Sequence, residues 1–128
     1  MHILPIYASL LAFLFVALSI RTIRARRSLR IGLGHAENPT MLRAMRVHAN
    51  FAEYVPMALL LIFLVESSGA RPVFVHLLGS ALLIARLSHA FGVSREPENF
   101  RFRVFGMAVT FAVLLTCASY LFIATLAR

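Results

Sequence analysis

The chain has 128 residues, of which 60 % are hydrophobic and only 14 % are charged. This hydrophobic share is higher than that of ordinary soluble domains, so the composition excludes a typical soluble globular protein. All 13 basic residues are arginine and the five acidic residues are glutamate, which gives a net charge of +8. Because the arginines flank apolar runs, a membrane surface explains the positive charge better than nucleic acid does.

Four apolar runs predict an all-α integral membrane protein, a four-helix bundle in which residues 1–128 form a single domain. The expected spans lie at about 3–28, 41–66, 72–91 and 103–127. Each reaches the roughly 20 residues that a helix needs to cross a bilayer, the second and third only with their polar ends included. Arginines rather than a cleavage site follow the first run, so we expect it to stay in the mature chain. Asn38 and Pro39 mark the start of the second span. Gly69 and Pro72 mark a tight hairpin before the third.

The distribution of arginines predicts the orientation in the membrane. Eleven are assigned to the two long connectors and their flanks: Arg21, Arg24, Arg26, Arg27, Arg30, Arg43, Arg46, Arg86, Arg95, Arg101 and Arg103. Only Arg71 and Arg128 fall on the other side. Cytoplasmic connectors of membrane proteins carry an excess of arginine and lysine. We therefore expect the polar connectors in the cytoplasm and both termini outside.

A stripe of polar side chains opens the second span, within the sequence RAMRVHANFAEYVP at residues 43–56. At roughly 100° per residue, Arg43, Arg46, Asn50 and Glu53 share one helix face, with Tyr54 at its edge. A charge facing lipid at the bilayer centre costs about 2.5–3.5 kcal/mol, so Glu53 is expected to have a protein, ligand or water partner.

Two interpretations of the stripe stay open. In the first, Arg43 or Arg46 pairs with Glu53, and Asn50 bonds a neighbouring helix, as a structural staple. In the second, the stripe is a binding site within an arginine-lined cleft. Such a cleft suits a ligand with several carboxylates and an amine, because guanidinium groups bind carboxylates and a carboxylate binds an ammonium group.

Several other residues carry simpler expectations. His48 lies opposite the stripe and is expected to make an inter-helix or inter-subunit hydrogen bond, with a catalytic role as the alternative. Cys117 lies in an apolar run and is expected to be a small buried hydrophobe. Gly79 and Gly106 should permit close helix approach. The remaining histidines lack partners at metal-ligand spacing, so the sequence predicts no metal site.

These segments together resemble the MAPEG family, the membrane-associated proteins in eicosanoid and glutathione metabolism. The resemblance covers nearly the whole chain, in the order ARRSLRIG, RVHANFAEYVP, ARLSHAFG and RFRVFGMAVT. The second of these motifs is the specific one. The resemblance implies a bacterial-type member of the inner membrane, a homotrimer of four-helix subunits, and glutathione as a co-substrate bound between neighbouring subunits.

The resemblance also implies roles for single residues. Those expected to bind glutathione are Arg26, Arg46, Asn50, Glu53 and Tyr54. Arg103 is expected to stabilise the glutathione thiolate, with Arg101 as the alternative. The synthase branch of the family carries two tyrosines at the end of the third helix, where this chain has His89 and Val93. His89 is therefore expected either to bind glutathione in the cleft or to anchor an interface.

Three functions follow from these expectations. The first is a membrane-bound glutathione-dependent transferase or peroxidase acting on lipophilic electrophiles or lipid hydroperoxides. The second is a non-catalytic lipid-binding or scaffold protein of the same fold, which the two missing tyrosines favour. The third, a small four-span exporter, is disfavoured because such proteins need an acid deep in a span. The expected partners are further copies of the chain, membrane lipid and a lipophilic small molecule, with no nucleic acid.

Overall fold

The computed structural model describes residues 2–127, which form four long helices: α1 (Leu4–Leu29), α2 (Pro39–Ser67), α3 (Pro72–Ser94) and α4 (Phe100–Leu126). Each helix is long and apolar enough to cross a bilayer. The prediction of an all-helical chain with four apolar spans is therefore confirmed.

Local chemistry fixes where the helices begin and end. The Asn38 side-chain oxygen accepts a hydrogen bond from the Met41 backbone N–H at 3.0 Å, so α2 already begins at Pro39. Asn99 caps α4 in the same way, and α4 begins at Phe100, earlier than the sequence predicts. An oxygen in this position satisfies a backbone N–H that has no partner within the helix. Between α2 and α3, Gly69 adopts a φ of +88°, a conformation that favours glycine.

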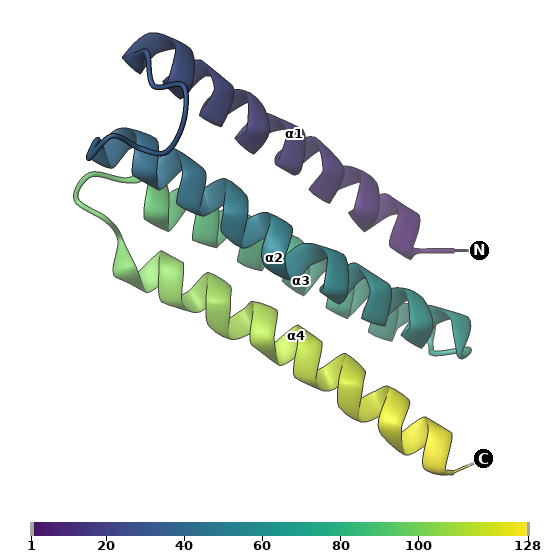
Figure 1. The fold of residues 1–128 in the computed structure, drawn as a ribbon. Helices are drawn as coiled ribbons and strands as arrows, with labels where there is room; N and C mark the ends of the chain where they lie inside the picture. Colours follow the sequence, from purple (N-terminus) through teal and green to yellow (C-terminus); the bar gives the residue numbers. More distant parts are fainter. Residues whose placement is uncertain (1, 128) are drawn as a thin grey trace.

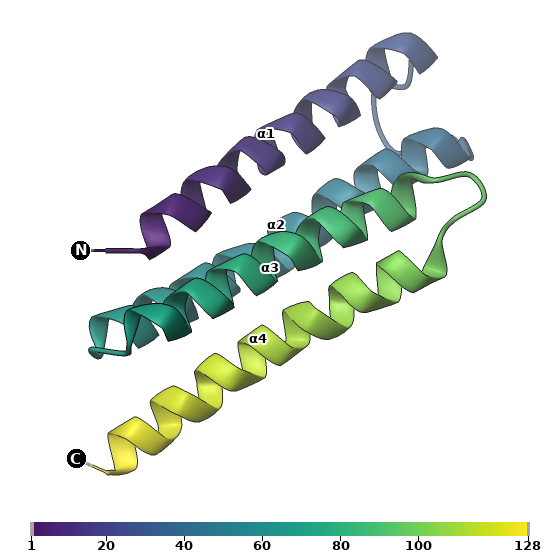
Figure 2. The ribbon, with the colours of Figure 1, turned by 180° about the vertical axis from the view of Figure 1, so that it is seen from behind.

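Each helix runs antiparallel to the next one along the chain, and α2 and α3 lie side by side in the middle of the molecule (Figure 1). Helices α1 and α4 lie on opposite edges of this central pair, as the reverse view in Figure 2 also shows. Within the described residues, α1 and α4 make no contact with each other. Both long connectors lie at one end of the molecule, the connector end, while both termini and the α2–α3 hairpin lie at the other.

The surface of the molecule is apolar over much of its area. Large side chains such as Phe13, Leu115 and Phe122 are about two-thirds exposed or more, at 73 %, 68 % and 67 %. Apolar exposure on this scale is unusual for a soluble monomer. It is what a helix surface in contact with lipid requires.

Glycines let the helices approach closely at two places, as predicted. A Cβ atom on Gly106 would lie 2.5 Å from the Ala85 carbonyl oxygen, so α4 meets α3 there backbone to backbone. A Cβ atom on Gly79 would lie 2.3 Å from the Tyr7 ring, which joins α3 to α1. Small residues at such crossings let transmembrane helices pack closely.

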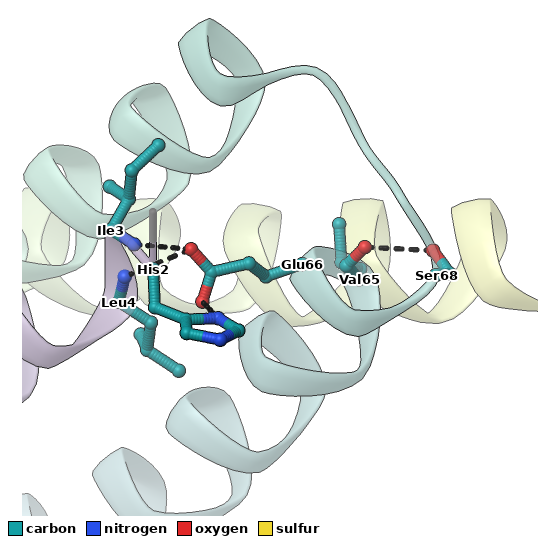
Figure 3. A network of polar contacts seen from close by, with 6 residues as sticks. All are labelled: His2, Ile3, Leu4, Val65, Glu66 and Ser68. Atoms are coloured by element: carbon teal, nitrogen blue, oxygen red, sulfur yellow. Dashed lines mark hydrogen bonds and ion pairs between the residues drawn. The ribbon is translucent and has the colours of Figure 1, made fainter.

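A glutamate fastens the start of α1 to the end of α2 (Figure 3). Glu66 accepts hydrogen bonds from the backbone N–H groups of Ile3 and of Leu4, the latter at 3.3 Å. Its second oxygen lies 3.8 Å from the His2 ring nitrogen Nδ1. The carboxylate therefore satisfies free N–H groups at the positive end of the α1 dipole and joins two helices at the same time.

Candidate functional site

A cleft of about 280 Å³ lies at the connector end, between α2, α3 and α4. We call it the connector-end cleft. Four of the residues predicted to act in a site line it: Arg46 and Asn50 on α2, His89 on α3 and Arg103 on α4. The other lining residues are Pro39, Leu42, Arg43, Val93 and Glu98. Side chains far apart in the sequence therefore meet in one polar hollow.

Four other predicted site residues do not line this cleft. Glu53 is exposed on α2, and Arg101 is exposed on α4. The Tyr54 ring packs edge to face on the Phe111 ring, with 5.5 Å between their centroids. Arg26, at the end of α1, donates to the Gly34 carbonyl oxygen at 3.0 Å in the first connector. The single chain therefore brings together only part of the predicted set.

The ion pair between an arginine of the stripe and Glu53, which the staple interpretation requires, is not among the ion pairs of the described residues. Instead, Arg43 pairs with Glu96 of the second long connector, with 3.0 Å between Nε and Oε1. Arg43 also donates to the Arg95 carbonyl oxygen at 2.9 Å. This arginine lies in the second turn of α2, where the α3–α4 connector can reach it.

The other half of the staple interpretation, a hydrogen bond from Asn50 to a neighbouring helix, is confirmed. The Asn50 side-chain oxygen accepts a hydrogen bond of 2.6 Å from the guanidinium of Arg86 on α3. Arg86 was predicted to flank a connector, but it is only 1 % exposed. It lies two turns before the end of α3, about 12 Å along the helix axis. The prediction was wrong because Arg86 finds its partners inside the bundle.

The partners of Arg86 come from all three helices around the cleft. Besides Asn50, its Nη1 lies 3.4 Å from the Thr110 hydroxyl and 3.8 Å from the Met107 sulfur. Its Nη2 lies 3.3 Å from Nδ1 of His89. A buried charge is tolerated only where it is hydrogen-bonded. One sequence signal could have revealed this role, namely that Arg86 interrupts the apolar run VFVHLLGSALLIARL and does not follow it.

The charges of the connector-end cleft are mostly positive. Arg43, Arg46 and Arg103 line it, and Glu98 is the single carboxylate among the lining residues. Glu98 accepts a hydrogen bond of 2.8 Å from Arg103 Nη1. Arg46 makes no ion pair within the described residues. An excess of guanidinium groups in a hollow favours an anionic ligand.

The simpler expectations can also be compared with the structure. His48 Nε2 lies 3.0 Å from the Ser19 hydroxyl of α1, and its ring stacks on Phe15, so the predicted inter-helix hydrogen bond is confirmed. Cys117 is buried, as expected. In the described part of the chain, no group of three or more His, Cys, Asp or Glu side chains lies close enough to hold a metal ion.

Four apolar helices that are long enough to cross a bilayer, with a polar, arginine-rich cleft at one end, define a small integral membrane protein. The chain belongs to the MAPEG family, whose family model matches residues 4–123. The resemblance drawn from the sequence is thereby confirmed.

Two known proteins resemble this chain along most of its length. One is the inner membrane protein YecN of Escherichia coli (strain K12), which is 36 % identical over 110 residues. The match covers 86 % of this chain and 82 % of the relative. The protein of the same name from Escherichia coli O6:H1 matches with the same identity and coverage. No solved structure matches the chain. Together with the four apolar helices, these relatives support a multi-pass protein of the inner membrane.

Proposed function

We propose that this protein is a membrane-bound glutathione-dependent transferase or peroxidase that acts on lipophilic electrophiles or lipid hydroperoxides. The observation that carries the proposal is the connector-end cleft. In it, Arg46, Asn50, His89 and Arg103 from three helices surround one hollow. Glutathione has two carboxylates, an ammonium group and a thiol, which suits a hollow with three arginines and one glutamate in its wall.

Each group of glutathione has a chemically suitable partner. Arg46 carries a guanidinium without an ion-pair partner among the described residues and would bind a carboxylate. Arg103 would stabilise the thiolate, since a nearby guanidinium lowers the pKa of a thiol and so raises the fraction of its nucleophilic form. In conjugation, the thiolate sulfur bonds to the electrophilic carbon and the leaving group departs. In peroxide reduction, the thiolate sulfur takes one oxygen from the hydroperoxide, which leaves as the alcohol. The thiol of a second glutathione then bonds to the oxidised sulfur, giving the disulfide and releasing the oxygen as water.

A homotrimer would complete the site. The single chain leaves Glu53 exposed on α2, and it leaves α1 and α4 apart on opposite edges of the central pair. If glutathione binds between neighbouring subunits, Glu53 and Tyr54 of one subunit and Arg26 of another can supply the remaining contacts. We further propose that the connector end faces the cytoplasm, with both termini outside. Without Arg86, ten arginines still favour that side against two.

The test is a calorimetric titration of the purified protein with glutathione in detergent, repeated with Arg46→Ala and with Arg71→Ala. Arg71 is an exposed arginine that precedes α3 at the opposite end, so its variant controls for the loss of one charge. We expect saturable binding that Arg46→Ala weakens and Arg71→Ala leaves unchanged. Assays of conjugation and peroxide reduction with Arg103→Ala then test thiolate stabilisation. Absence of binding at millimolar glutathione would contradict the proposal.

A second candidate function is non-catalytic lipid binding or scaffolding by the same fold. Two observations favour it. The cleft wall has Val93 instead of an aromatic hydroxyl, and Arg103 is already paired with Glu98 at 2.8 Å. This candidate would lead if glutathione does not bind and neither reaction is detected.

A further inference from the structure

The buried guanidinium of Arg86 determines how two residues of the cleft wall can bond. A guanidinium has five N–H donors and no acceptor, so any atom in a hydrogen bond with it must be the acceptor. Arg86 Nη2 lies 2.6 Å from Asn50 and 3.3 Å from Nδ1 of His89. In both contacts, therefore, Arg86 donates and the Asn50 or His89 atom accepts.

For Asn50, the contact fixes the orientation of the amide. Its oxygen must face Arg86, so its NH₂ group, with two donor hydrogens, takes the other position. This nitrogen has no hydrogen-bond partner among the described residues. It is also not one of their fully buried unpaired polar atoms, so it is accessible. Because Asn50 lines the connector-end cleft, its free donors are available there.

For His89, the contact fixes the tautomer. Nδ1 must carry a lone pair toward Arg86, so the ring is neutral and its hydrogen sits on Nε2. His89 also lines the cleft, and its Nε2 makes no hydrogen bond in the part of the chain that the structure describes. The N–H at Nε2 is therefore a free donor as well.

We propose that Arg86 is a positioning residue that makes Asn50 and His89 hydrogen-bond donors toward the cleft. The nearby arginines Arg43, Arg46 and Arg103 can only donate too. Apart from Glu98, the polar side chains of the wall then present N–H groups. Such a wall favours a ligand group that only accepts, such as a carboxylate or a thiolate, over its protonated or esterified form, in which a hydrogen or alkyl group would face one of the donors.

The tautomer of His89 is a direct test that does not depend on any ligand. We would label the histidines with ¹⁵N and record long-range ¹H–¹⁵N correlations at neutral pH in detergent. The His89 signals are assigned by their loss in His89→Gln or, should that variant not fold, by removing the other four histidines. The proposal expects a neutral ring with the hydrogen on Nε2. A ring protonated on Nδ1, alone or together with Nε2, would overturn it.

Arg86 variants then test the cause. Arg86→Met removes the donors, and we expect a mixture of His89 tautomers and about tenfold weaker glutathione binding. Arg86→Lys keeps an N–H donor and should restore the single tautomer, while Arg71→Met should change neither readout. A His89 tautomer that is the same in Arg86→Met as in the unmodified protein would contradict the role of Arg86. If Arg86→Met does not fold, the tautomer in Arg86→Lys decides, because a mixture there contradicts the role as well.

The ligand part of this inference rests on the proposed glutathione site, and the two can fail separately. A protein with the Nε2–H tautomer that binds no glutathione contradicts the proposed function and supports the donor arrangement. A protein that binds glutathione and its diethyl ester equally well supports a glutathione site and contradicts the selection of acceptor groups.

Discussion

Replacing Asn50 by leucine should destabilise the bundle by leaving a buried charge without its best partner. The bond from Arg86 to Asn50 is 2.6 Å long, whereas the contacts of Arg86 with His89 and Thr110 are 3.3 and 3.4 Å. The two longer contacts already exist and cannot replace the lost bond.

The size of the effect can be estimated from the burial of Arg86. Hydrogen bonds to charged groups contribute about 1.5–3 kcal/mol in soluble proteins, while polar contacts between membrane helices average about 0.6 and reach about 1.7 kcal/mol. Because Arg86 is 1 % exposed and has no carboxylate partner among the described residues, we place Asn50→Leu near the upper membrane value. We expect a loss of about 2 kcal/mol in the free energy of unfolding, or about thirtyfold in the unfolding equilibrium.

Reversible unfolding in mixed micelles, followed by circular dichroism, would measure this loss. Met57→Leu is the matched control, because Met57 is an exposed residue of the same helix, at 54 % exposure, and should lose less than about 0.5 kcal/mol. In the double variant with Arg86→Met the unpaired charge is gone, so stability should be no lower than in Asn50→Leu alone. The reasoning would be refuted if Asn50→Leu lost as little stability as the control. It would also be refuted if the losses caused by Asn50→Leu and Arg86→Met simply added in the double variant.

Three further predictions concern other contacts. Glu66→Gln should weaken the attachment of α1 and lower stability by about 1 kcal/mol, with faster hydrogen exchange in the first turn of α1. Gly106→Ala should separate α4 from α3 and cost about 1–3 kcal/mol in the same unfolding assay, since the new Cβ would lie 2.5 Å from the Ala85 carbonyl oxygen. Glu98→Gln should strengthen glutathione binding several-fold in calorimetry, because it frees Arg103 and removes a negative charge from the cleft wall.

Matched variants separate these effects from the substitution itself. Glu37→Gln removes an exposed carboxylate in the first connector and should leave both stability and binding unchanged. Gly32→Ala adds a methyl group with no atom of the described residues within 4 Å and should be tolerated. Unchanged exchange in Glu66→Gln, or unchanged stability in Gly106→Ala, would argue against the contact described. Weaker binding in Glu98→Gln would mean that Glu98 binds the ligand and does not compete with it.

The features that the sequence predicted correctly depend on neighbouring residues. Length and apolarity define the helices, Asn38 caps the turn that follows it, and Gly69 permits the hairpin, all within a few residues along the chain. The helical period also places Arg46 and Asn50 on one face, and both line the cleft.

The features that the sequence did not reveal depend on partners far away in the chain. Periodicity suggested Glu53 as the partner of Arg43, but Glu96 comes from a connector that has no period. The count of arginines on each side of the membrane included Arg86 as a flanking charge. Its partners lie 36 and 24 residues away on two other helices, so the count could not reveal that it is buried. Residue type and local spacing carry no information about such tertiary contacts.

The arrangement of the helices has a consequence for how the protein assembles. Among the helices that precede it in the chain, each helix packs most on the one immediately before it: α2 on α1, α3 on α2 and α4 on α3. The first and last helices do not meet within the described residues. Contacts between sequence neighbours have a low entropic cost of closure and form rapidly. Each helix that leaves the ribosome after the first therefore finds a docking surface on the helix made just before it, so the chain is suited to vectorial, helix-by-helix assembly during translation.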